Sequence, residues 1–410
     1  SSVKGDRPLH DVAIAGGGMV GLSLAAAIGG LGLDVAVIEP VAPEADEQPS
    51  FDSRTTALSN GSRRVLEGIG AWRAVEAEAT AIRRIHVSER GAFGTAVLTA
   101  AEQGVAALGH TIENRLLGRA LRERVAALPR VRQVAARVAQ VEAGADAVRL
   151  GTDAGDRIAA RLLVAADGAQ SAVRASLGIG ATVDDYGQHA VIAHLDSTRF
   201  HEHTAYERFT PEGPIAVLPI REGRCAVVWT LAPEAARRAL GLADAEFLAE
   251  LQAAFGLRLG RFSRVGRRQS YPLALTRAAQ LTAPRAAILG NAAQSLHPVA
   301  GQGFNLALRD VAMLAELLAD ARGGDPGSPA LLARYANWRG PDREAVVRFT
   351  DTLVRGFALD LAPLRQARGS GLFLFDLLRP VKHEFARRTM GLAGRQPRLV
   401  QGLPLEDARA

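Results

Sequence analysis

The chain has 410 residues, of which 48% are hydrophobic and 22% charged, so it can build more than one domain and fold around a core. Its single cysteine, Cys225, excludes an internal disulfide, a cysteine-based zinc site and an iron–sulfur cluster, and it is typical of a reducing compartment. The net charge of +6 is compatible with binding to a nucleic acid or to an anionic membrane surface. The arginines are scattered along the chain instead of clustered, so we expect no nucleic-acid binding. The N-terminal residues lack a secretory signal, and we expect a cytoplasmic protein.

The first forty residues predict a strand, a glycine-rich turn, a helix and a second strand, over 11–15, 20–30 and 34–38. Gly16, Gly18 and Gly21 form a Gly-x-Gly-x-x-Gly pattern in the turn, and Glu39 ends the second strand. Gly16 permits the tight turn, Gly18 lets the backbone approach a pyrophosphate, and Gly21 lets helix and strand pack closely. Glu39 is expected to bind the adenosine ribose. The pattern alone does not distinguish FAD from NAD.

Charges are absent from residues 12–33, a stretch long enough to span a bilayer. Its glycines divide it into a β-rich part and a helical part, so we expect a buried strand, turn and helix instead. Further helices are predicted over 60–80 and 113–128, and strands over 84–88, 96–98, 134–141, 147–150 and 162–165.

The strand predicted over 162–165 is followed by Asp167 and Gly168. An aspartate at the carboxyl end of a strand lies where α/β sheets bind ligands. Taken alone, Asp167 is explained as well by capping of the helix that follows. A polar segment over 51–59 contains Arg54, which becomes a candidate flavin contact once the other motifs are considered.

From about residue 180 the pattern favours antiparallel strands, predicted over 191–195, 215–220 and 224–231, the last two joined as a hairpin by Arg221–Gly223. We expect these strands to form a sheet inserted between two halves of the nucleotide-binding domain. Val217, Val227 and Trp229 could form the wall of a substrate site or belong to an ordinary core.

The stretch from Gly290 to Asp310 is the most informative one. Gly290-Asn291 follows a strand predicted over 286–289, a Pro/Gly turn spans 298–303, and Asn305 is expected to begin a helix whose N–H groups could stabilise negative charge on a reduced flavin. Two glycine-rich turns so far apart indicate a ligand long enough to need both, and FAD fits. His297 could be taken for a base, but beside Pro298 a structural role is favoured.

Beyond a linker over 323–329 the chain is predicted to be mostly helical. The apolar segment 371–378, with basic residues on either side, could dock at a membrane surface. It could equally pack on its own domain or across a subunit interface.

Together these motifs resemble the single-component FAD aromatic hydroxylases, the class that includes para-hydroxybenzoate hydroxylase. The segments 52–59, 206–210, 271–275 and 297–306 narrow the resemblance to the ubiquinone-biosynthesis hydroxylases, in particular those acting on 2-polyprenyl-6-methoxyphenol. The resemblance covers residues 11 to about 391. One departure is Gly290-Asn291, where the wider class has Gly-Asp, so the role of Asn291 is less certain.

The resemblance implies an α/β fold with a Rossmann-like FAD-binding domain (8–80, 111–178 and 276–330), an inserted antiparallel-sheet substrate domain (81–110 and 179–275) and a C-terminal helical segment (331–410). It implies no metal site, and the predicted contacts with FAD are Gly16, Gly18, Gly21, Glu39, Arg54, Arg115, Asp167, Gly168, Asn291, Pro298, Gly301, Gln302, Gly303 and Asn305.

The implied reaction uses NAD(P)H as a transient co-substrate to reduce FAD, and a flavin C4a-hydroperoxide formed with O₂ then hydroxylates a polyprenyl phenol. No residue stands out as the base that deprotonates the phenol. The insoluble substrate implies a peripheral location at the inner membrane or in a ubiquinone-biosynthesis complex, and a homo-oligomer is compatible. Two alternatives stay open: an FAD hydroxylase of another aromatic or ring position, and a non-catalytic subunit that binds flavin or prenyl lipid.

Overall fold

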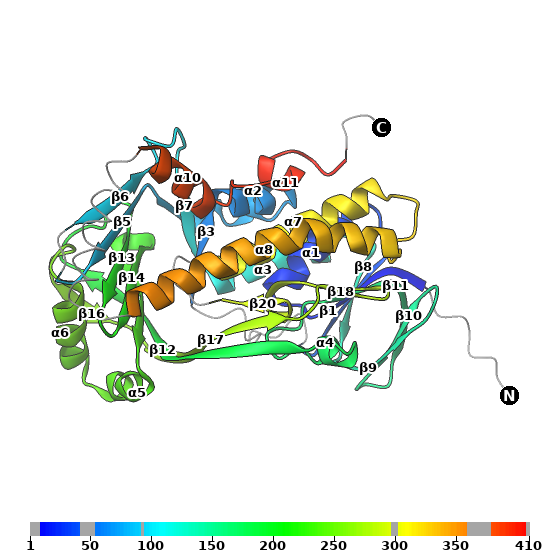
Figure 1. The fold of residues 1–410 in the computed structure, drawn as a ribbon, viewed down its shortest axis with the longest axis horizontal. Coiled ribbons are helices and arrows are strands. Elements are labelled where there is room, and N and C mark those ends of the chain that lie inside the picture. Colours follow the sequence, from blue (N-terminus) through cyan, green and yellow to red (C-terminus); the bar gives the residue numbers. More distant parts are fainter. Residues whose placement is uncertain (1–8, 42–53, 92–93, 297–301, 359–378, 407–410) are drawn as a thin grey trace.

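The computed structural model describes residues 9–41, 54–91, 94–296, 302–358 and 379–406. Its strands form sheets of eight, nine and three strands. The molecule is elongated, with the eight-stranded sheet toward one end and most of the nine-stranded sheet toward the other (Figure 1).

The eight-stranded sheet has a parallel centre, in the order β19-β11-β1-β2-β8. These strands are β1 (Leu9–Ala15), β2 (Val35–Glu39), β8 (Val131–Ala135), β11 (Arg157–Ala165) and β19 (Ala286–Ile288). Antiparallel strands β9 (Val138–Ala143), β10 (Val148–Thr152) and β18 (Thr282–Ala283) extend it. Strands β1, β2, β11 and β19 carry apolar runs buried on both faces, which is the pattern of a parallel sheet covered by helices, whereas β8 is partly exposed.

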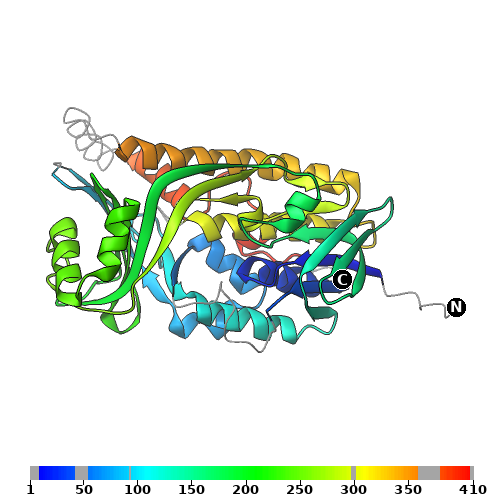
Figure 2. The same ribbon diagram turned by 90° about the horizontal axis from the view of Figure 1, so that it is seen from below.

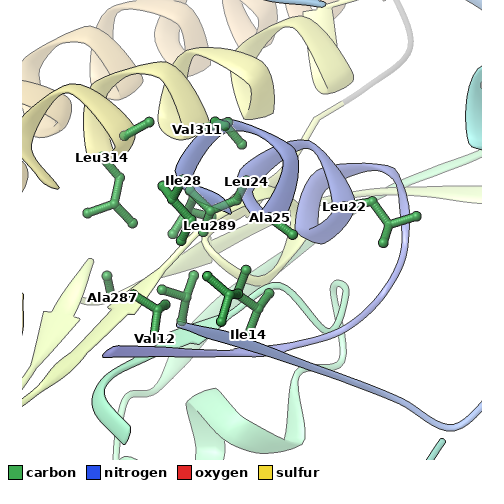
Figure 3. Close-up of a cluster of buried hydrophobic side chains, with 14 of the residues drawn as sticks. Val12, Ile14, Leu22, Leu24, Ala25, Ile28, Ala287, Leu289, Val311 and Leu314 are labelled. Atoms are coloured by element: carbon green, nitrogen blue, oxygen red, sulfur yellow. The ribbon is translucent and has the colours of Figure 1, made fainter. Parts of the chain in front are cut away.

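Helix α1 (Met19–Gly29) packs between β1 and helix α7 (Gln302–Asp320), and α3 (Asn114–Ala126) contacts α1 as well. Figure 3 shows Leu24 and Ile28 of α1 between the strand residues Val12 and Ile14 and Leu314 of α7. Residues 21–29 of α1 are all buried, so the charge-free stretch is a strand, a turn and a core helix, as predicted. In the described part of the chain, no helix has both the length and the hydropathy needed to cross a membrane.

The nine-stranded sheet has the order β20-β17-β12-β15-β14-β13-β5-β6, with β16 beside β12. Its strands are β5 (Arg84–Glu89), β6 (Thr95–Thr99), β12 (Ala181–Ser197), β13 (Thr204–Thr210), β14 (Gly213–Pro219), β15 (Cys225–Leu231), β16 (Phe262–Val265), β17 (Gln269–Ala278) and β20 (Gln294–Ser295). Helices α5 (Pro233–Gly241) and α6 (Asp244–Phe255) pack against one face. The long strands β12 and β17 run side by side toward the eight-stranded sheet (Figure 2).

The remaining elements surround these two sheets. The three-stranded sheet consists of β3 (Thr55–Ser59), β4 (Thr80–Ile82) and β7 (Gly109–Glu113). The other helices are α2 (Asn60–Gly68), α4 (Ala172–Ser176), α8 (Pro329–Ala358), α10 (Arg379–Thr389) and α11 (Arg398–Gln401). The predicted hairpin at Arg221–Gly223 is present, since β14 and β15 pair antiparallel across that turn.

Three element predictions differ from the structure. The helix expected over 60–80 ends at Gly68, because Gly70 adopts a positive φ of 82°, and short 3₁₀ turns follow. The strand expected over 134–141 is two strands, β8 and β9, since the chain turns away after Ala136 bonds to Glu39. Helix α7 begins at Gln302 rather than at Asn305, which lies in its first turn. The segments 51–53, 297–301 and 371–378, with His297, Pro298 and Gly301, lie outside the described residues.

A buried ion pair joins the C-terminal helix α8 to this frame. Arg339 of α8 and Asp310 of α7 are 0% and 1% exposed, and Arg339 Nε donates to Asp310 Oδ1. Asp310 Oδ2 accepts from the Gly290 N–H at 2.9 Å and from the Gln294 side chain at 3.1 Å. Arg339 also donates to Asp342 at 2.7 Å. The pair therefore links α7, α8 and the Gly290 turn.

Replacing Arg339 by Met should lower the free energy of unfolding by about 3–5 kcal/mol, because the Asp310 carboxylate stays buried without its partner. Urea unfolding followed by circular dichroism measures this. As a control, Arg237→Met removes a solvent-exposed pair with Glu234 and should cost less than about 1 kcal/mol. Equal losses in both variants would contradict the role given to the buried pair.

Candidate flavin and substrate cavity

A cavity of about 1670 Å³ extends from the carboxyl ends of the parallel strands to the inner face of the nine-stranded sheet. Typical small-molecule pockets hold about 300–1000 Å³, so this one has room for a dinucleotide and a second ligand together. Nine of the predicted FAD contacts line it, namely Gly16, Gly18, Glu39, Arg54, Asp167, Gly168, Asn291, Gly303 and Asn305. The structure therefore brings together residues that lie almost three hundred positions apart in the sequence.

The first glycine loop forms one end of the cavity. Gly16 has φ of 105°, and a β-carbon there would collide with the Ala166 carbonyl of the neighbouring strand end. Gly18 is the N-cap of α1 and offers no side-chain hydrogen bond to the first turn, so the N–H groups of that turn are left for another acceptor. Gly21 does not line the cavity. A β-carbon on Gly21 would collide with the Gly16 carbonyl oxygen, so this residue sets how closely helix and loop pack.

Glu39 holds the glycine loop against the end of β2. Its Oε2 accepts from the Gly17 N–H at 2.7 Å, and its Oε1 accepts from the Val41 N–H at 3.1 Å. The side chain is half-buried and lines the cavity. A carboxylate keeps further acceptor positions after two such bonds, so it can still accept from a ligand hydroxyl.

Asp167 caps the helix that follows it and lies on the cavity wall. Oδ2 accepts from the Val173 N–H at 3.1 Å, and Oδ1 accepts from the Ser171 hydroxyl, so the carboxylate fastens the start of α4. Asp167 and Gly168 also line the cavity. Gly168 has φ of 90°, and a β-carbon there would meet nothing within 4 Å, so its backbone is open to a ligand.

The Gly290 turn and the first turn of α7 form the opposite part of the cavity wall. Asn291 is exposed on this wall. The side-chain amide of Asn305 forms two hydrogen bonds with the backbone of β3. Oδ1 accepts from the Ser59 N–H at 2.8 Å, and Nδ2 donates to the Ala57 carbonyl at 2.9 Å. Asn305 therefore fixes β3 to α7 whatever else it contacts. The helix starts at Gln302, whose side chain is not described.

Arg54 and its neighbour connect the middle of the cavity to the nine-stranded sheet. The Arg54 guanidinium carbon lies 4.8 Å from the centre of the Tyr271 ring, within the range of a cation–π contact. Thr55 Oγ1 and His194 Nε2 are 3.1 Å apart. Burial lowers the pKa of His194, so its ring is neutral at neutral pH and can share a hydrogen bond with Thr55 in either direction.

Arg115 is not among the residues that line the cavity. Its side chain is more than half exposed, and Nε donates to Glu113 at 2.7 Å. Its neighbour Asn114 lines the cavity instead, and Asn114 Oδ1 accepts a hydrogen bond from the Thr56 hydroxyl. A flavin contact by Arg115 thus finds no support in this geometry, and Asn114 is a better candidate.

The nine-stranded sheet presents alternate residues to its two faces. Val217 and Trp229 pack with α6 in a core, where the Trp229 and Phe247 rings are 5.7 Å apart, and neither lines the cavity. Their sequence neighbours Leu218 and Val228 line it instead. The core alternative therefore holds for Val217 and Trp229, because successive side chains of a strand point to opposite faces. Val227 packs in the same core but also borders the cavity, so both alternatives apply to it.

Sequence reasoning missed several polar groups on the cavity wall, among them Asn114, His194, Glu207 and Gln269. The last three lie on strands of the nine-stranded sheet, where only the register decides which face a side chain takes. A polar residue alternating with apolar ones, such as Glu207 between Ala205 and Phe209, is the signal that could have indicated them. The described residues contain no group of three or more potential metal ligands.

Comparison with known proteins identifies the type of site. Residues 10–350 match the family model described as FAD binding domain. Ubiquinone hydroxylase UbiL of Rhodospirillum rubrum is 40% identical over 402 residues, which cover 96% of this chain and 93% of that protein. The 3-demethoxyubiquinol 3-hydroxylase of Escherichia coli is 34% identical, with 93% of this chain and 98% of that protein covered.

Solved structures give the same fold. The p-nitrophenol 4-monooxygenase PnpA of Pseudomonas putida DLL-E4 superposes with a TM-score of 0.78 at 21% identity, covering 95% of this chain and 99% of that one. The predicted fold class, a Rossmann-like FAD-binding domain with an inserted antiparallel sheet, is confirmed. FAD as the cofactor is confirmed by the family match.

The glycine loop provides a direct test of how the FAD site is built. Gly21→Ala should weaken FAD binding at least about tenfold, a loss of about 1.4 kcal/mol, because the new methyl group pushes the Gly16 backbone away from its position. Gly30→Ala, just after the same helix, is the control, since its β-carbon would be 3.7 Å from the nearest atom. Flavin absorbance after gel filtration and a fluorescence titration measure retention and affinity. Unchanged affinity in Gly21→Ala would contradict the proposed packing role.

Proposed function

This chain belongs to the FAD-binding family matched over residues 10–350 and is an FAD-dependent aromatic hydroxylase, and we propose that its substrate is a polyprenyl phenol of ubiquinone biosynthesis. We propose a 2-polyprenyl-6-methoxyphenol in particular. The relatives named ubiquinone hydroxylase and 3-demethoxyubiquinol 3-hydroxylase, with 40% and 34% identity over at least 93% of the chain, support the pathway. The observation that carries the substrate class is the cavity, which continues from the flavin site along an apolar sheet face.

FAD supplies the redox chemistry when it is bound, because it takes hydride from NAD(P)H and activates O₂. The residues of the chain bind and orient it. We assign the diphosphate to the N–H groups at the Gly18 end of α1, and the ribose to Glu39. We assign the flavin end to the wall formed by Arg54, Asn291 and the first turn of α7. NAD(P)H dependence is typical of this family.

The rest of the cavity wall suits an aromatic ring with a long apolar tail. Strands β5, β6, β13 and β14 line it with aliphatic side chains, including Ile85, Leu98 and Leu218. Phe385 and Thr389 of α10 line it as well. Such a wall excludes water from the reacting ring, which protects the activated oxygen from wasteful decay. Docking at the inner membrane, a place in a ubiquinone-biosynthesis complex and a homo-oligomer remain predictions.

The proposal is tested on purified holoenzyme supplied with NADPH, air and a short-tailed 2-prenyl-6-methoxyphenol. We expect a product heavier by one oxygen atom in mass spectrometry, with the added atom labelled when ¹⁸O₂ replaces air. Fragmentation of the product gives the ring position, which decides between this substrate chemistry and hydroxylation elsewhere on the ring.

The same assay with 4-hydroxybenzoate is the control for the substrate class. Equal turnover of this water-soluble phenol would contradict the polyprenyl substrate while leaving an FAD hydroxylase. FAD binding without NADPH consumption, for all phenols tried, would favour a non-catalytic subunit.

The apolar wall makes a second prediction. Ala216→Phe places a ring in the cavity opposite the flavin end, so the KM for the prenylated phenol should rise at least about tenfold, which is about 1.4 kcal/mol, while FAD content stays unchanged. Ala253→Phe adds the same group to the exposed side of α6 and should leave KM unchanged. A KM in Ala216→Phe equal to that of the wild type would show that the substrate lies elsewhere.

A further inference from the structure

The cavity wall contains a carboxyl group on an otherwise apolar face. Glu207 lies in β13, where Ala205, Glu207 and Phe209 line the cavity. The intervening residues reach toward α6, since the Tyr206 ring is 5.7 Å from Phe255 and Arg208 Nε donates to the Ala254 carbonyl at 3.2 Å, although Tyr206 also borders the cavity. Among the described lining residues of β5, β6, β13 and β14, Glu207 has the one carboxylate.

Among the described residues, Glu207 has no hydrogen-bond or ion-pair partner that would explain its burial. Its cross-strand neighbours are Val87 on β5 and Ala216 on β14, and neither side chain can donate a hydrogen bond. Oε1 is inaccessible to solvent and has no hydrogen-bond partner among the described residues. The side chain as a whole still has some exposed surface, and that surface faces the cavity. A buried carboxyl group without a partner is costly, so a ligand is the natural source of the missing hydrogen bond.

We propose that Glu207 is a catalytic residue that binds the phenolic hydroxyl of the substrate and accepts its proton; this inference rests on the proposed hydroxylase function. In that step the O–H bond of the phenol breaks and its electron pair stays on the phenolic oxygen. The proton forms a new O–H bond on the carboxylate. The ring becomes richer in electrons where the electrophilic oxygen is added. After the oxygen is added, the attacked ring carbon loses its hydrogen as a proton, which goes to the second oxygen atom of O₂ as that atom becomes water. Glu207 returns its own proton to the phenolic oxygen of the product, so Glu207 is regenerated and no electrons pass through it.

The protonation behaviour of Glu207 suits this role. Burial alone raises its pKa to about 8, with no charged group contributing to the shift. A phenol has a pKa of about 10, so the transfer is uphill by about 2 pKa units instead of the roughly 6 that an ordinary carboxylate would face. At pH 7 about a tenth of the carboxyl groups are ionised, and a base whose pKa lies near the working pH is the most effective.

No other group on this wall is as free to take the proton. The strands beside Glu207 present Val87 and Ala216, and β15 presents Val228 next to Ala216. The other ionisable groups of this sheet that line the cavity are Tyr206 on β13, His194 on β12 and Tyr271 on β17, with Arg224 before β15 and Arg267 before β17. Burial raises the pKa of Tyr206, so its hydroxyl stays protonated at neutral pH and is no base. His194 already bonds to Thr55, and Tyr271 donates to Gln269 at 3.3 Å under the Arg54 guanidinium.

The test compares Glu207→Gln, which keeps size and polarity but removes basicity, with Glu207→Leu, which removes both. The matched control is Glu212→Gln, because Glu212 is exposed in the turn between β13 and β14. All variants are assayed as holoenzymes of equal FAD content with the short-tailed phenol, NADPH and air. Product, NADPH oxidation and H₂O₂ are measured from pH 6 to pH 10, a range chosen to span about 2 pKa units on either side of Glu207.

We expect Glu207→Gln to lower the rate of hydroxylation at least about 100-fold at pH 7 and to divert NADPH oxidation into H₂O₂. The wild-type rate should rise with pH and level off above about pH 8, because the ionised carboxylate is the active form and burial sets its pKa at about 8. The Gln variant should lack this inflection. Glu207→Leu should in addition bind the phenol more weakly, as measured by flavin fluorescence without NADPH. Glu212→Gln should match the wild type.

A rate for Glu207→Gln within about threefold of the wild type, with the same pH profile, would overturn this inference and leave the hydroxylase function intact. A loss of product in Glu207→Gln accompanied by an unchanged pH inflection would also overturn it, since the titrating group would then be another one. Failure of the wild-type enzyme itself to hydroxylate any phenol is a different result, because it overturns the proposed function first.

Discussion

The buried carboxylate of Asp310 is the constraint on which the arrangement of this molecule depends. One oxygen accepts from Arg339 of α8, and the other accepts from the Gly290 N–H and from Gln294. Arg309 of α7 and Arg339 both pair with Asp342, so the cluster extends across the α7–α8 contact. A charged group this deeply buried is tolerated only with such partners, and it therefore ties the turn after β19 to two helices.

That constraint also sets the geometry of the cavity. Helix α7 carries Asn305, whose amide holds β3 against the helix through Ser59 and Ala57. The strand β3 carries Thr55, which contacts His194 on β12 of the nine-stranded sheet. Helix α7, strand β3 and the hydrogen bonds between these elements thus connect the Asp310 cluster to the far wall of the cavity. The Gly290 end of the cavity and the neighbouring sheet face are positioned by the same contacts.

The two faces of the nine-stranded sheet have different roles: one packs against helices, and the other lines the cavity. The face toward α5 and α6 is filled by residues such as Val217, Trp229 and Phe247, which form a dry core. On β5, β6, β13 and β14, the face toward the cavity has mainly aliphatic side chains together with Glu207, whose burial raises its pKa. A carboxyl group placed on an apolar face breaks the pattern that the rest of the strand follows. Proteins tolerate such a break mainly where function requires it.

The amino-acid sequence by itself determined the local features: the strand, glycine turn and helix at the N-terminus, the Asp167 and Gly290 turns, and the hairpin at Arg221–Gly223. These follow from backbone conformation and from apolar periodicity, which act over a few residues. Only the tertiary structure decided which polar groups face the cavity. Asn305 meets Ser59 across 246 positions, and Thr55 meets His194 across 139, contacts that no local pattern encodes. The side of the sheet that Glu207 occupies depends in turn on strand register, which packing against α6 selects.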